Sequence, residues 1–129
     1  YDVIISNPPF YESDLKGNIA GKNIAHHDDG LKLHELSRIL GKQLTNIGSF
    51  FLLLPAKRID KVKNILEAQG LFINHIVKVR QTERHEPFRI MIRGSFQKEN
   101  TQESELIIKT GNDYTPAFIS LLKDYYLNL

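Results

Sequence analysis

Two short segments of the chain are almost continuously apolar. The first covers residues 1–6, with Val-Ile-Ile at its centre, and the second covers residues 49–54 and ends before Pro55. Such runs are typical of strands that are buried on both faces of a parallel sheet. We therefore predict two parallel strands. Because the first strand needs neighbours on both sides and is already under way at residue 1, we expect the chain to be part of a longer protein.

Apolar residues at helical spacing predict three helices. The first has Leu33, Leu36, Leu40 and Leu44 and stops at Asn46-Ile47-Gly48. The second has Ile59, Val62, Ile65 and Leu66 on one face, with Lys61, Lys63 and Asn64 on the other, and it ends at Gly70. The third starts at Thr115-Pro116, residue types that favour the N-cap and the first helical position. Its expected buried stripe is Phe118, Leu121, Leu122 and Tyr125.

Alternating apolar positions predict further strands in the second half of the chain. Residues 71–79 and 88–96 predict a strand pair joined by the charged segment 80–87, and residues 105–109 predict one more short strand. The resulting order of elements is that of the second half of a doubly wound, Rossmann-like α/β sheet, ending in an antiparallel strand pair and a C-terminal helix. We expect residues 1–129 to be part of one such domain.

Composition narrows the function classes. The chain has 129 residues, 41% of them hydrophobic, a formal net charge of +2 and no cysteine. The absence of cysteine excludes a disulfide framework, a thiolate metal site and a cysteine nucleophile. The small net charge gives no global argument for a polyanionic partner. Since neither a membrane-spanning run nor a secretory signal is visible, we expect a cytoplasmic protein.

The motif Asn7-Pro8-Pro9-Phe10 directly follows the first predicted strand. A proline-rich turn that merely closes the strand is the simplest interpretation. However, doubly wound sheets bind ligands at the carboxyl ends of their strands, and the long polar segment 11–30 follows instead of a tight return. Asn-Pro-Pro-(Tyr/Phe) resembles the catalytic motif of methyltransferases that act on adenine N6, guanine N2 or glutamine amides.

The chemistry of such a motif suits an exocyclic amine, which is a poor nucleophile because its lone pair is delocalised into the ring. The side-chain oxygen of Asn7 and the carbonyl of Pro8 can accept the two N–H bonds of the amine and direct its lone pair towards a methyl donor. The two prolines fix the direction of that carbonyl. Phe10 can stack on a base that has left its helix.

The resemblance extends over the whole chain to the bacterial tRNA(Val) adenine-N6 methyltransferase family, class I enzymes that use S-adenosylmethionine (SAM) and modify the adenine next to the anticodon. Three segments carry it: Asp2–Phe10 match Asp-x-Ile-x-x-Asn-Pro-Pro-(Tyr/Phe), Leu54–Arg58 match Leu-Pro-x-x-Arg, and Tyr114–Tyr126 match a terminal Tyr-Thr-Pro-x-Phe-x-x-Leu-Leu-Lys-Asp-(Tyr/Phe)-Tyr. The family's Ala-Arg-His corresponds to Ala25-His26-His27, where His26 replaces the arginine. The terminal segment separates this family from other enzymes with the Asn-Pro-Pro motif.

The resemblance implies SAM as the cofactor and tRNA as the substrate. It assigns Asn7, Pro8, Pro9 and Phe10 to catalysis and places Asn7 and Pro8 near the SAM methyl group as well. Family members bind SAM largely through a Gly-rich loop, whereas this chain contains no Gly-x-Gly. We therefore expect the chain to be the C-terminal, substrate-side part of a methyltransferase domain, to lack the SAM-binding N-terminal part, and to be inactive alone.

Basic side chains are expected at the edge of the sheet where the parallel strands end. They are Lys57, Arg58, Arg80, Arg84, His85 and Arg89. A cationic rim beside a base pocket suits contacts with RNA phosphates. We predict substrate contacts for Phe10, Lys57, Arg58, Arg80 and Arg84, and for His27 because it matches the family's histidine. The alternative is that these are solvated loop charges, partly cancelled by Glu83 and Glu86.

Other functions stay open on the sequence alone. His26 and His27 invite a metal site, but adjacent side chains point apart and no third ligand lies at helical spacing, so we predict no metal. The motif also suits methylation of a protein glutamine amide or of guanine N2 in rRNA. An RNA-binding half-domain without catalysis is the non-enzymatic alternative, and the intact motif argues against it. The basic edge and residues 114–126 favour RNA.

Overall fold

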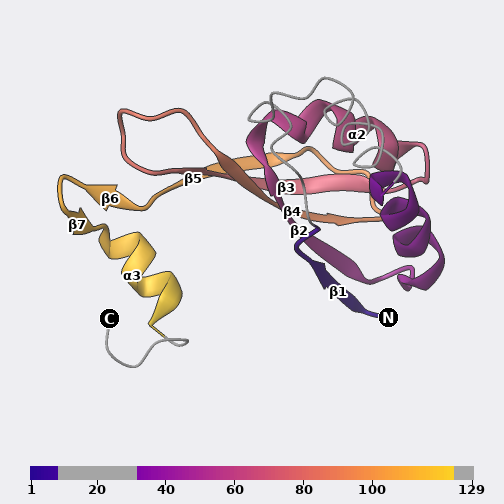
Figure 1. Cartoon of the computed structure of the whole chain (residues 1–129). Helices are drawn as coiled ribbons and strands as arrows, with labels where there is room; N and C mark the ends of the chain where they lie inside the picture. The colour runs from indigo at the N-terminus through magenta and orange to yellow at the C-terminus, as the bar shows by residue number, and fades with distance from the viewer. Residues whose placement is uncertain (9–31, 124–129) are drawn as a thin grey trace, which may run out of the picture.

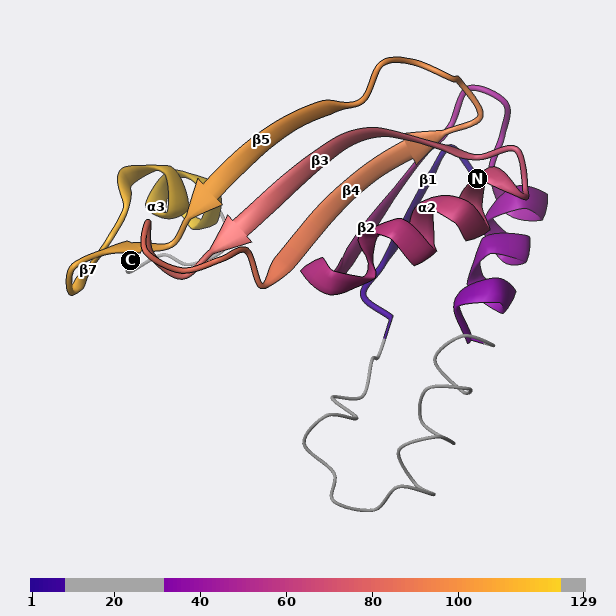
Figure 2. The same cartoon turned by 90° about the horizontal axis from the view of Figure 1, so that it is seen from above.

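The computed structural model describes residues 1–8 and 32–123. Five strands form a mixed sheet in the order β1-β2-β4-β3-β5. Their bounds are Val3–Ser6 for β1, Ser49–Pro55 for β2, Phe72–Arg80 for β3, Arg89–Ser95 for β4 and Gln102–Ile107 for β5. β4 runs antiparallel to its neighbours β2 and β3, whereas β1 is parallel to β2 and β5 is parallel to β3 (Figure 2). Four strands therefore point in one direction, and the predicted strand pair is β3 and β4.

Two helices lie on one side of the sheet (Figure 1). Residues 32–43 are helical, and a 3-10 turn, η2 (Ala56–Arg58), leads into α2 (Ile59–Glu67). The predicted helical faces are buried, with Leu33, Leu40, Val62 and Leu66 at most 2% exposed. They pack against the inward residues of the sheet, which include Phe50, Leu52, Leu54, Ile90 and Ile92. The predictions of the first two helices are confirmed.

The opposite face of the sheet is open at β1 and β2. Val3 is 57% exposed, Ile5 is 76% exposed and Phe51 is 38% exposed. The prediction that β1 is buried on both faces is therefore wrong for the described part of the chain. There, β1 lies at the sheet edge, and only its Ile4 packs against the core.

A small hairpin and a short helix follow β5. The hairpin consists of β6 (Lys109–Thr110) and β7 (Asp113–Tyr114), and the helix is α3 (Pro116–Leu122). Gly111 in the two-residue turn has a φ of 63°, a conformation that favours glycine. The sequence predicts one strand over residues 105–109, whereas β5 starts and ends earlier. The hairpin escapes prediction because strands of two residues show no alternation.

The start of α3 agrees with the sequence, but its packing does not. The Thr115 hydroxyl oxygen accepts a hydrogen bond from the Phe118 amide at 3.2 Å and so caps the helix. The predicted buried stripe is wrong: Phe118 and Leu122 are half-buried, Leu121 is 47% exposed, and Tyr125 lies outside the described residues. α3 lies at the end of the molecule beyond β5, far from β1 and the two helices (Figure 1). No helix in the described ranges is long and apolar enough to cross a membrane.

Candidate active site

The carboxyl ends of β1, β2 and β3 meet at one edge of the sheet. Pro55 of β2 and Val79 of β3 both pair in register with Arg89 of β4, so these three residues are level across the sheet. Ser6 pairs with Leu52, and the chain therefore leaves β1 towards the same edge. The predicted convergence of segments 7–10, 55–58 and 80–87 is confirmed as far as the structure describes them.

Asn7 and Pro8 occupy the first two positions after β1. Asn7 is exposed and Pro8 is half-buried. Asn7 lines one end of a cavity of about 430 Å³ on the open face of the sheet, with apolar walls that include Phe51, Leu53 and Met91. The Asn7 amide is thus accessible beside a surface that binds water poorly. Pro9, Phe10 and His27, also predicted as site residues, lie outside the described residues.

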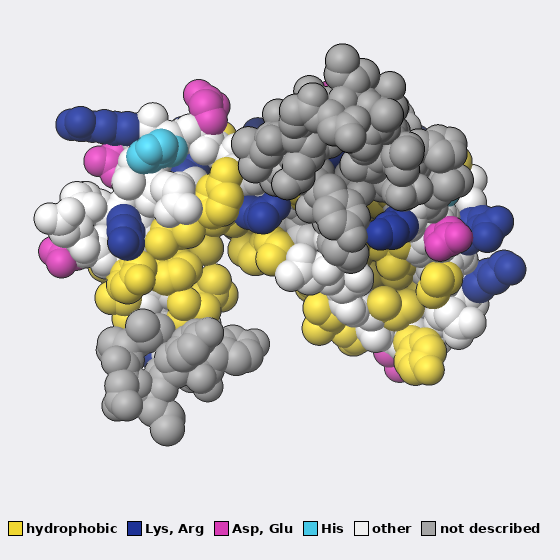
Figure 3. Space-filling model, in the orientation of Figure 1, with side chains coloured by type: hydrophobic (Ala, Val, Ile, Leu, Met, Phe, Trp, Pro, Cys, Tyr) yellow, Lys and Arg dark blue, Asp and Glu magenta, His cyan; other side chains and the backbone are white. Residues whose placement is uncertain are grey.

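The basic residues of this edge differ in how accessible they are. Lys57 in η2 and Arg84 in the β3–β4 loop (residues 81–88) are exposed, whereas Arg58 is half-buried. Figure 3 views the molecule from this side and shows Lys and Arg side chains over the β3–β4 loop and β6, and between these and the helices. A second cavity, of about 550 Å³, lies between α2 and β5, and its lining combines three lysines with two carboxylates: Lys57, Lys63, Lys78, Asp60 and Glu103. The exposed cations of this edge that suit a polyanion are therefore Lys57 and Arg84, although the net charge of the chain is small.

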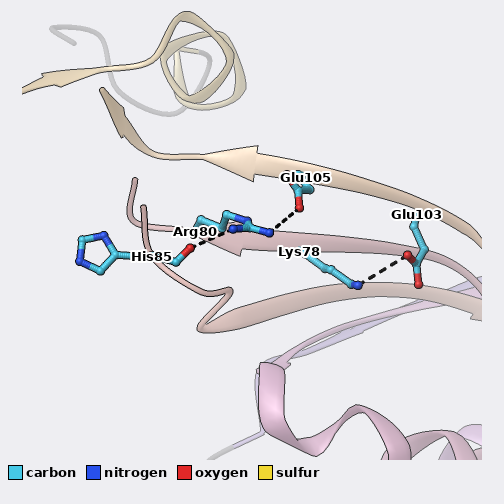
Figure 4. Close-up of polar contacts among 5 residues, drawn as sticks. All are labelled: Lys78, Arg80, His85, Glu103 and Glu105. Carbon is cyan, nitrogen blue, oxygen red and sulfur yellow. Dashed lines mark hydrogen bonds and ion pairs between the residues drawn. The ribbon is translucent and has the colours of Figure 1, made fainter. Parts of the chain in front are cut away.

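Arg80 is engaged within the fold. Its guanidinium donates from Nη2 to Oε1 of Glu105 at 2.9 Å and from Nη1 to the carbonyl oxygen of His85 at 3.1 Å (Figure 4). The Arg80 side chain is 25% exposed. An arginine that already holds two acceptors is less available to RNA phosphate than Arg84, for which the described residues show no side-chain partner.

Glu105, the partner of Arg80, was not singled out by the sequence. It lies on β5, and a second pair joins the same two strands, between Nζ of Lys78 and Oε2 of Glu103 at 3.5 Å. The sequence contains the signal: cations at 78 and 80 and carboxylates at 103 and 105 both have the two-residue spacing of one strand face. The signal becomes informative only once β3 and β5 are known to be neighbours.

The described residues contain no group of three or more His, Cys, Asp or Glu side chains that could hold a metal ion. The two histidines considered for such a site, His26 and His27, lie outside those residues. The prediction of no metal therefore stays a prediction.

Relatives of known name match the chain from end to end. It is 36% identical over 131 residues to a tRNA1(Val) (adenine(37)-N6)-methyltransferase of Pseudoalteromonas translucida, covering 100% of this chain and 56% of the relative. It is 35% identical over 130 residues to the protein of the same name from Christiangramia forsetii, covering 100% of this chain and 54% of the relative. The chain is related to these methyltransferases. The resemblance stated from the sequence is confirmed, and the chain spans about half the length of the curated relatives it matches.

A solved structure shares the fold. A predicted O-methyltransferase from Agrobacterium tumefaciens superposes with a TM-score of 0.60 at 14% identity, covering 96% of this chain and 51% of that chain. At this identity the likeness concerns the fold alone, and it confirms the expected half of a class I methyltransferase sheet. No protein-family model matches the chain.

Proposed function

We propose that the chain is the C-terminal, substrate-side half of a SAM-dependent methyltransferase that methylates N6 of the adenine next to the anticodon in tRNA(Val). The observation that carries this proposal is the match of the whole chain, at 36% identity, to a relative of that name. The position of Asn7 and Pro8 directly after β1 supports it, because open α/β sheets bind their ligands at that edge. Its cytoplasmic location is part of the proposal.

The residues of this chain act on the amine of the substrate. Oδ1 of Asn7 and the carbonyl oxygen of Pro8 accept the two N–H bonds of adenine N6, which favours a more tetrahedral nitrogen with a directed lone pair. Because the Asn7 amide is neutral, it accepts these bonds without first removing a proton. The fixed φ of Pro8, and the restriction that the following proline places on its ψ, limit the direction of the second acceptor, and positioning of this kind contributes to the rate.

The described residues fit only the reactive end of SAM, which supplies a methyl group bonded to a sulfonium. Asn7 and the apolar wall beside it would lie next to that end. An apolar surface solvates a cation less well than water does, so this wall would favour the loss of positive charge that accompanies methyl transfer. A Gly-rich loop for the rest of the cofactor is absent from the sequence. We therefore expect the chain by itself to transfer no methyl group.

Arg84 should contribute to RNA affinity and not to chemistry. Its exposed guanidinium at the edge suits a phosphate contact, so Arg84→Ala in the complete enzyme should raise KM for tRNA by roughly three- to tenfold and leave kcat unchanged. Arg84→Ala should also lower the slope of log affinity for tRNA against log salt concentration, by about the amount expected for one lost phosphate contact. Methylation kinetics at several salt concentrations test this.

Lys42→Ala is the matched control for Arg84→Ala. Lys42 is exposed at the end of the helix over residues 32–43, and this end is near the start of β1, where the Thr45 amide donates to the Tyr1 carbonyl at 2.8 Å. Lys42→Ala therefore removes a cation from the opposite edge of the sheet. Equal effects of the two variants would show that the basic edge has no special role.

The decisive experiment incubates the complete enzyme and tritiated SAM separately with tRNA and rRNA from a strain that lacks the enzyme and with a release factor, followed by nucleoside and protein analysis. Label in N6-methyladenosine supports the proposal. Label in N2-methylguanosine of rRNA would keep the fold and change the target base. Label in a release factor and not in RNA would identify a glutamine-amide methyltransferase, and RNA binding without label in any substrate would favour a non-catalytic binding domain.

A further inference from the structure

Arg80 connects three segments of the chain: β3, the loop that follows it, and the distant strand β5. It is the last residue of β3, and its guanidinium reaches Glu105 on β5 and the backbone of His85 in the β3–β4 loop (Figure 4). A guanidinium is planar and presents its donors in a fixed fork, so two acceptors held by it have a defined position relative to each other. The loop is thereby attached to the edge strand of the sheet.

The β3–β4 loop also has internal bonds that fix its shape. The Thr82 hydroxyl oxygen accepts from the Arg84 amide at 3.2 Å and lies 2.7 Å from Nδ1 of His85. The His85 amide donates to the Thr82 carbonyl at 3.1 Å, and the Phe88 amide donates to the Val79 carbonyl at 2.9 Å. These bonds make a compact turn of residues 82–85. At the start of the loop, the Lys109 amide donates to the Gln81 carbonyl at 2.9 Å, so residue 81 is held beside the segment after β5. None of these bonds ties the turn of residues 82–85 itself to β5. The contact of Arg80 with the His85 carbonyl does so through Glu105.

We propose that Arg80 and Glu105 are positioning residues: together they hold the β3–β4 loop so that Arg84 faces the RNA. This inference rests on the proposed function, and it replaces a direct substrate contact of Arg80. To reach a phosphate, the guanidinium would have to leave both the Glu105 carboxylate and the His85 carbonyl. Arg84, in contrast, has its amide fixed by Thr82 and its side chain exposed, so it can meet a phosphate without breaking any bond described here.

The pair of Lys78 and Glu103 provides a matched control within the same two strands. On β5, the register partner of Lys78 is Glu105 and that of Arg80 is Ile107. Each cation forms its ion pair with the carboxylate two residues before that partner, Lys78 with Glu103 and Arg80 with Glu105. Lys78 and Glu103 are 40% and 57% exposed, and the described contacts of this pair do not include the loop. Glu103→Gln therefore removes one strand-to-strand ion pair of similar chemistry and leaves the loop attached.

The experiment compares Glu105→Gln with Glu103→Gln in the complete enzyme. Glu105→Gln should raise KM for tRNA by roughly three- to tenfold, with kcat, KM for SAM and the melting temperature unchanged, whereas Glu103→Gln should change none of them. Amide hydrogen exchange at residues 84, 85 and 88 should be faster in Glu105→Gln only. Equal KM values and equal exchange in the two variants would overturn the proposal.

A double variant tests whether the effect passes through Arg84. In an Arg84→Ala background, Glu105→Gln should raise KM for tRNA by less than a further twofold, since the side chain that the loop positions is already missing. Full multiplication of the two effects would show that Arg80 or Glu105 meets the RNA independently and would overturn the positioning role. If the wild-type enzyme methylates no tRNA, the proposed function fails, while the exchange comparison still decides whether Glu105 holds the loop.

Discussion

Asn7→Ala should lower kcat of the complete enzyme by about 10²–10³-fold, the loss typical of removing one preorganised polar group from a reacting centre. Asn7 is exposed at the edge where three strands end, beside an apolar cavity wall, so its amide oxygen is accessible to a substrate amine. Without this acceptor only the Pro8 carbonyl orients the amine. Because the lost interaction belongs to the transition state, KM for tRNA should change little. Single-turnover methylation of tRNA with tritiated SAM measures the chemical step directly.

Two controls distinguish a catalytic role of Asn7 from an effect of the substitution on stability. Since Asn7 is exposed, the free energy of unfolding of Asn7→Ala should stay within about 0.5 kcal/mol of wild type. Asn7→Asp keeps an acceptor oxygen at the same place and should retain more activity than Asn7→Ala. Wild-type kcat in the alanine variant would exclude Asn7 from catalysis and leave the Asn-Pro-Pro segment with only the role of a turn.

The elements of the core and the position of the motif could be predicted because each depends on local patterns. The apolar run before Pro55 and the leucines after residue 32 define β2 and the first helix without knowledge of any neighbour. The end of β1 follows in the same way, since the apolar run stops before Asn7. Once strands and crossover helices are known, the rule that parallel strands end at one edge places the candidate site.

The contacts and burial of individual side chains depend on spatial neighbours that the sequence alone does not show. The sequence predicts an RNA contact for Arg80 because the loop after it is charged, and this stays a prediction. The pairing of β3 with β5 adds a contact of its guanidinium with Glu105 that the sequence does not indicate. The apolar stripe of α3 looked buried because its spacing is helical, but α3 lies beyond the core and its Leu121 is largely exposed. Periodicity shows which face is apolar, and only the tertiary arrangement shows what covers that face.

Gly94→Ala should destabilise the protein by about 3 kcal/mol, at the upper end of the usual cost of overfilling a packed core. Gly94 of β4 is opposite Phe50 of β2, whose ring is fully buried. A Cβ at Gly94 would lie 2.2 Å from Cζ of Phe50 and 2.6 Å from the carbonyl oxygen of Phe72, so both a core ring and the β3 backbone would have to move. Urea unfolding of wild type and variant gives the difference.

The same substitution at Gly41 should have the opposite sign. Gly41 lies in the helix over residues 32–43, and the nearest atom to an added Cβ is Oε1 of Gln69 at 3.5 Å, an ordinary contact. Gly41→Ala should therefore stabilise the protein by roughly 0.5–1 kcal/mol through helix propensity alone.

Phe50→Leu added to Gly94→Ala should recover only part of the loss, because the contact with the Phe72 carbonyl persists. An unchanged unfolding free energy in Gly94→Ala would mean that β2 and β4 do not pack around Phe50 as described.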